Sequence, residues 1–151
     1  KLIVSYIGPK FSPQHHQTIL GALSELNFQK LNTRNAAEEV LAKEIKNFGV
    51  RQFLMKNLYW VKKGELGLRI NLKVLKEKIE EVGVALPQDA CFAKATLFLK
   101  GSNSDYIEDR DETLIKKHFP EAKIQTIANA GHWLHAENSS DFYTYVIDFC
   151  K

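Results

Sequence analysis

Cysteine and long apolar runs are scarce in this 151-residue chain, and each shortage excludes a class of protein. Two cysteines, Cys91 and Cys150, are too few for a disulfide framework, so nothing points to an oxidising compartment and we expect a cytoplasmic protein. No apolar run reaches the roughly 18 residues that a membrane span needs. The first residues also lack the charged segment, long apolar segment and cleavage site of a secretory signal peptide.

A concentration of charge of one sign is also absent. The net charge is only +3, and the densest lysines (Lys73, Lys76 and Lys78) are interrupted by glutamate or apolar residues. This pattern is typical of a solvated helix face and not of a stripe that binds phosphates. We therefore expect no nucleic-acid partner.

The chain has no initiator methionine and opens at Lys1, directly before an apolar run. A chain that opens in the middle of a strand is expected to be a fragment or a processed product. Its length is still enough for a domain with a buried core.

Three short apolar segments predict the buried strands of an α/β protein. They are residues 2–7, 95–99 and 123–128, and the first two are closed by Gly8-Pro9 and Lys100-Gly101. The amphipathic segment 109–119 lies between the last two strands and predicts a right-handed parallel crossover. A final helix is expected to begin at Ser139 or Ser140. We assign residues 1–11 and 86–151 to this core of about three parallel strands with flanking helices.

Residues 12–85 have helical apolar spacing and predict a second, mainly helical domain. A hairpin with Gly64 in its turn is expected between residues 59 and 70. The expected helix starts and breaks are Ser12-Pro13, Thr33, Gly49 and Asn71.

Polar side chains follow the second and third predicted strands at the point where each strand ends. Ser104 and Asp105 lie in the polar turn beyond residues 95–99, and His132 follows residues 123–128. The carboxyl ends of parallel strands meet at one edge of a sheet, where ligands and catalytic groups gather. A hydroxyl or carboxylate beside an imidazole would hold the histidine in one tautomer as a general base.

These segments resemble the end of an α/β-hydrolase. The resemblance covers essentially all 151 residues, and its helical part is similar to the cap, or lid, of small bacterial esterases of the abhydrolase group. The residues that carry it are Phe98 to Asp105, Phe119-Pro120, Gly131 to Glu137, residues 1–9, His15-His16, residues 51–54 and residues 68–71. In this superfamily the triad runs serine, acid, histidine along the chain, which implies that His132 is the catalytic histidine.

The nucleophile of this family is missing from the chain. No Gly-x-Ser-x-Gly occurs, and Ser24 and Ser104 lack the flanking glycines of a nucleophile elbow. The oxyanion-hole donors would also lie in the N-terminal half that this chain lacks. We therefore expect the chain alone to be inactive and to need that half, or a second copy of itself, as a partner.

Two residues compete to orient His132. Ser104 occupies the common acid position, three residues after Gly101, and Asp105 comes one residue later. Both remain open. Tyr6 stands at a position where related esterases place an alternative acid, so that route is closed here.

The remaining candidates concern the substrate and a metal. Trp133, next to the histidine, is a candidate for lining an acyl pocket. Several apolar residues of the lid are expected in its core, with a place in that pocket as the alternative: Phe53, Leu54, Leu58 and Trp60. His15-His16 could be surface residues or line that pocket. His132 and His135 are three apart, but no cluster of ligands accompanies them and Glu137 is expected to cap the next helix. We therefore expect no metal and no cofactor.

The sequence thus predicts a serine-type ester hydrolase that forms an acyl-enzyme with small acyl esters. The resemblance, and not the composition, implies that the acyl group is uncharged and largely apolar. A non-catalytic remnant or binding module that keeps the lid is the alternative.

Overall fold

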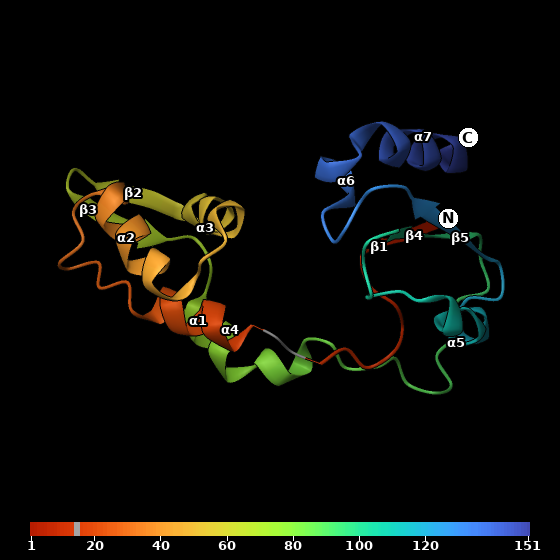
Figure 1. The fold of residues 1–151 in the computed structure, drawn as a ribbon. Helices are drawn as coiled ribbons and strands as arrows, with labels where there is room; N and C mark the ends of the chain where they lie inside the picture. The colour runs from red at the N-terminus through yellow and green to blue at the C-terminus, as the bar shows by residue number, and fades with distance from the viewer. Residues whose placement is uncertain (14–15) are drawn as a thin grey trace. The chain divides into compact units, whose positions relative to one another are not determined.

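The computed structural model describes residues 1–13 and 16–151, which form two compact units (Figure 1). One unit comprises Lys1–Ser12 and Gly83–Lys151, and the other comprises Pro13–Val82. No helix among the described residues is long and apolar enough to cross a membrane.

The first unit contains a three-stranded parallel sheet, as the sequence predicts. Its strands are β1 (Leu2–Ser5), β4 (Thr96–Gly101) and β5 (Ala122–Ile127), in the order β1-β4-β5. Leu97 pairs with Ile3 on one side and with Lys123 on the other. The crossover between β4 and β5 consists of the short 3₁₀ helix η2 (Asp109–Asp111) and α5 (Glu112–His118).

Helices cover both faces of this sheet (Figure 1). Successive strand residues point to opposite faces, so Leu97 and Leu99 pack with residues of α7 (Ser139–Cys150), whereas Phe98 packs with Ile115 of α5. This two-sided cover explains why β4 is apolar at consecutive positions and not at alternate ones. The four-residue helix α6 (Leu134–Glu137) precedes α7 and is an element that the sequence did not predict.

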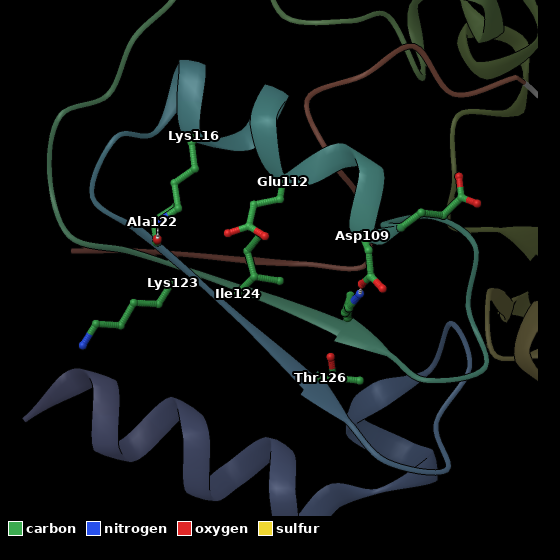
Figure 2. A pocket seen from close by; sticks show the side chains of 9 residues that line it. Asp109, Glu112, Lys116, Ala122, Lys123, Ile124 and Thr126 are labelled. Atoms are coloured by element: carbon green, nitrogen blue, oxygen red, sulfur yellow. Dashed lines mark hydrogen bonds and ion pairs between the residues drawn. The ribbon is translucent and has the colours of Figure 1, made fainter.

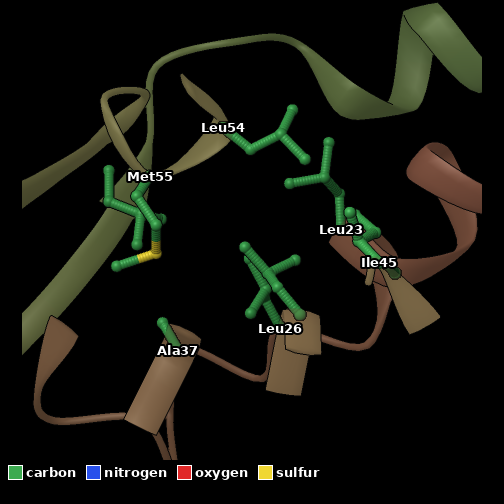
Figure 3. Packing of buried hydrophobic residues seen from close by; sticks show 9 residues of the cluster. Leu23, Leu26, Ala37, Ile45, Leu54 and Met55 are labelled. Atoms are coloured by element: carbon green, nitrogen blue, oxygen red, sulfur yellow. The ribbon is translucent and has the colours of Figure 1, made fainter. Parts of the chain in front are cut away.

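The second unit is a helical cluster with one hairpin. Its elements are α1 (Gln17–Ser24), α2 (Arg34–Glu44), α3 (Phe48–Met55), β2 (Leu58–Lys62), β3 (Glu65–Leu68), α4 (Leu72–Glu77) and the 3₁₀ helix η1 (Ile79–Glu81). Figure 3 shows its core, in which Leu23 and Leu26, Ala37 of α2, and Leu54 and Met55 of α3 converge.

Capping side chains set the helix starts in this unit. The Thr33 hydroxyl accepts a hydrogen bond from the Ala36 N–H (3.1 Å), and Asn71 does the same for Val74 (3.2 Å), as expected. The expected break at Gly49 is wrong, because Asn47 caps α3 through the Val50 N–H (3.1 Å) and Gly49 lies inside that helix. The expected start at Ser12-Pro13 is also wrong, since α1 begins at Gln17.

Candidate active site

Residues that follow all three strands of the parallel sheet come together at its carboxyl edge. Tyr6 follows β1, the turn of residues 102–105 follows β4, and His132 lies in the loop after β5. Three hydrogen bonds join the last two loops: Ser102 N–H to Ile127 O (3.0 Å), Asn103 N–H to Ala130 O (2.9 Å) and Asn129 N–H to Ser102 Oγ (2.9 Å). The loops that follow β4 and β5 are therefore in contact, as expected.

Gly101 makes this close approach possible. A Cβ atom at position 101 would lie 2.2 Å from the Ala130 carbonyl oxygen and 2.4 Å from that of Gly131. Both distances are far below van der Waals contact with backbone atoms, which cannot move as a flexible side chain can. Only glycine at this position lets the end of β4 pack against the loop that carries His132.

The two candidate orienting residues occupy different environments. Ser104 is half-buried and borders a crevice too narrow for a water molecule, together with Tyr6, Tyr106 and Gly131. Its hydroxyl accepts a long hydrogen bond from the Tyr106 N–H (3.4 Å). Asp105 is exposed and makes no hydrogen bond or ion pair with any residue that the structure describes.

His132 itself is exposed, and two tyrosine rings contact its imidazole. The ring centroid of Tyr106 lies 4.5 Å away with an interplanar angle of 32°, and that of Tyr6 lies 5.3 Å away. The backbone before His132 is held by Glu137, whose carboxylate accepts the Gly131 N–H (2.5 Å). Glu137 does not cap the next helix as expected, because the Asn138 side chain accepts the Asp141 N–H (3.2 Å) in that role.

Tyr6 takes part in this site in a way that sequence reasoning missed. It has a φ of 77°, in the left-handed region that bulky residues rarely enter, and its hydroxyl is hydrogen-bonded to Nδ1 of His135. Burial raises the pKa of the Tyr6 phenol, although the hydrogen bond donated by the backbone N–H of His135 acts in the opposite direction. No sequence signal could have identified it, because the apolar run of residues 2–7 places Tyr6 inside the expected strand, whereas β1 ends at Ser5.

The predicted substrate residues differ in exposure. Phe53 (53% exposed) and Trp60 (48%) present aromatic surface on the second unit. Leu54 and Leu58 are buried in the core of that unit, where they have little surface to offer a ligand. Trp133 is half-buried and precedes α6. His16 is exposed, and His15 lies outside the described residues.

A hollow elsewhere on the first unit has a different character. Figure 2 shows Glu112 of α5 and Asp109 pointing towards β5, where Ile124 and Thr126 line the hollow, while Lys123 points away from them. Its volume is about 420 Å³, and most of its lining is charged. This lining does not suit an uncharged acyl group, and His132 is not part of it. Within residues 1–13 and 16–151, no cluster of three or more histidine, cysteine or acidic side chains could hold a metal ion.

No protein-family model matches the chain, but several known proteins are similar to it. It is 35% identical to the sn-1-specific diacylglycerol lipase ABHD11 of Danio rerio, over 100% of this chain and 49% of that protein. It is 30% identical to Esterase YbfF of Escherichia coli, over 91% of this chain and 52% of that protein. The solved structure of a marine microorganism esterase matches with a TM-score of 0.92 and 35% identity, covering 99% of this chain and 60% of that one.

A parallel sheet with helices on both faces and a histidine beyond its last strand defines the C-terminal part of an α/β-hydrolase fold, and the chain belongs to that superfamily. A thioesterase domain from the curacin biosynthetic pathway, at 13% identity and a TM-score of 0.54, shares the fold alone. Within the superfamily, the relatives above are esterases and lipases by name. The chain spans about half the length of these curated relatives.

Proposed function

We propose that the complete protein is a serine-type ester hydrolase to which this chain contributes the catalytic His132, its orienting partner and the lid. The observation that carries the proposal is the junction at Gly101, where hydrogen bonds hold the turn of Ser104 and Asp105 against the loop of His132. The esterase and lipase names of the relatives support the same class of reaction.

In this mechanism the nucleophilic serine comes from outside residues 1–151, because the chain has no Gly-x-Ser-x-Gly motif. The His132 imidazole takes the proton of that serine as it attacks the ester carbonyl and then gives the proton to the leaving alkoxide. The acyl-enzyme is hydrolysed when His132 activates a water molecule in the same way. No metal or cofactor enters this scheme.

The substrate proposed is a small ester with an uncharged acyl group. Aromatic residues with accessible surface suit such a group, and we assign this role to Phe53, Trp60 and Trp133. Leu54 and Leu58 would support the lid from its core. The N-terminal half of the hydrolase, or a second copy of the chain, is the proposed partner, and the cytoplasm is the proposed location.

Hydrolysis of a short-chain aryl ester by the complete protein tests this function. His132→Ala should lower kcat by on the order of 10⁶-fold, as loss of a triad histidine does. Whichever of Ser104→Ala and Asp105→Asn removes the orienting group should cost up to about 10⁴-fold, while Asp148→Asn, an exposed control on α7, should cost nothing. A wild-type protein that binds esters without hydrolysing them would instead identify a binding module.

A further inference from the structure

The backbone at Tyr6 is held in a conformation that its own side chain disfavours. A φ of 77° is uncommon for any residue except glycine, and for a bulky tyrosine it persists only when the surroundings determine it. Tyr6 also lies directly beyond β1, where its N–H still reaches the Leu99 carbonyl of β4 (3.4 Å). The contacts of the Tyr6 side chain therefore hold its backbone in this conformation.

The Tyr6 hydroxyl binds the start of the helix that follows His132. The short helix α6 begins at Leu134, and Trp133, at its N-cap, makes no side-chain capping bond. The Tyr6 hydroxyl is hydrogen-bonded to Nδ1 of His135, which lies in the first turn of this helix. Tyr6 thus connects the end of β1 to the first turn of α6 through a side-chain hydrogen bond.

The ring of Tyr6 lies close to two imidazole rings, those of His132 and His135. Its centroid lies 5.8 Å from the His135 ring and 5.3 Å from the His132 ring, and Tyr106 contacts His132 from a different loop. Glu137, at the end of α6, accepts a hydrogen bond from the Gly131 N–H through its carboxylate. No acidic side chain among the described residues makes a hydrogen bond or ion pair to His135.

We propose that Tyr6 is a positioning residue for His132, because it ties the first turn of α6 to the end of β1 and packs its ring against the imidazole. The phenol O–H is the donor of its hydrogen bond to Nδ1 of His135, and this bond favours the tautomer of His135 that carries its proton on Nε2. The loop of residues 131–133 is then fixed at both ends, by the junction at Gly101 and by Tyr6. The effect on catalysis rests on the proposed ester hydrolase function, whereas the anchoring of α6 does not.

Nuclear magnetic resonance of the complete ¹⁵N-labelled protein tests the anchoring without any substrate. Tyr6→Phe keeps the ring and removes the hydroxyl, so the His135 backbone amide should exchange with solvent roughly tenfold faster. The ¹⁵N shifts of the His135 ring should also move from those of a fixed Nε2–H tautomer towards an average of both. Tyr143→Phe, at an exposed position of α7, is the matched control and should change neither signal.

Kinetics then separate this role from the hydrolase function. In a protein that hydrolyses esters, Tyr6→Phe should lower kcat about tenfold and leave KM unchanged. Unchanged His135 signals in Tyr6→Phe, or an unchanged kcat in an active enzyme, would overturn the proposal. Altered His135 signals in a protein without hydrolase activity would refute the proposed function and support the anchoring.

Discussion

Single residues decide whether the turn of residues 102–105 can meet the loop of His132, and Gly101 is the clearest of them. A Cβ atom at this position would overlap the carbonyl oxygens of Ala130 and Gly131, so its lack of a side chain is a requirement of packing. Gly21, in the middle of α1, has no atom within 4 Å of the position where a Cβ would lie. Replacement by alanine is therefore expected to change the stability of the protein in opposite directions at these two glycines.

Gly101→Ala should destabilise the protein by about 1–3 kcal/mol, because the new methyl group forces the His132 loop away from β4. Gly21→Ala should stabilise it by about 0.5–1 kcal/mol, because alanine favours the helical state. Chemical denaturation of both variants measures the difference. A Gly101→Ala variant as stable as the wild type would show that the loops do not pack as closely as described.

The sequence predicts which residues follow the strand ends, but it does not predict which side chains contact one another there. His132 and the turn of Ser104 and Asp105 follow apolar runs, and this pattern is visible without a structure. The role of Tyr6 is not visible, because it depends on a backbone φ and on a hydrogen bond to a residue 129 positions away. Long-range contacts of this kind leave no local pattern.

At the scale of elements, local side-chain chemistry predicts some boundaries and tertiary packing sets others. Thr33 and Asn71 cap their helices as their residue types predict. The helix α6 was not predicted, because four residues are too few to show an apolar period. Its start depends on the buried Leu134, which packs with Leu97 and Ile127 of the sheet.

The start of the crossover between β4 and β5 depends on a buried carboxylate. Asp111 accepts the Glu108 N–H (2.8 Å) and forms an ion pair with Lys10 (2.5 Å). Burial raises the pKa of Asp111, but the Glu108 N–H and the Lys10 ammonium outweigh this effect, and the net pKa lies below its usual 3.8. Because the folded-state pKa is lowered, the stabilisation is complete above the unfolded-state pKa and disappears as the pH falls through the folded-state value.

Asp111→Asn should therefore lower the free energy of unfolding at pH 7 by roughly 1.5–3 kcal/mol, the usual worth of a hydrogen bond to a charged group. Its stability should also fall less steeply than that of the wild type below the usual pKa of 3.8. Thermal melting between pH 7 and pH 2 checks both effects. Asp109→Asn removes a carboxylate whose side chain is 99% exposed, and a loss as large as that of Asp111→Asn would contradict this account.

At the scale of the whole molecule, the sheet of this chain ends at β1. Within the described residues β1 pairs with β4 alone, and its outer side has unpaired backbone groups. Leu2, Ile3 and Val4 are only half-buried, although the strands of parallel sheets are usually covered on both faces. Such an edge favours pairing with another strand.

Residues 1–151 alone should therefore dimerise or aggregate at low micromolar concentration, or bind the N-terminal half of the hydrolase when it is added. Light scattering measures the state of the isolated chain. A monodisperse monomer that melts cooperatively would contradict this prediction and favour a self-sufficient binding module.

The central claim is that this chain supplies the histidine of an ester hydrolase whose nucleophile lies outside it. Mass spectrometry of the complete protein after reaction with a fluorophosphonate, which labels activated serines, tests both halves of the claim. We predict one labelled serine outside residues 1–151, and labelling at least about 10³-fold slower in His132→Ala, because the imidazole activates that serine. Labelling of Ser104, or a labelling rate that His132→Ala leaves unchanged, would contradict the account.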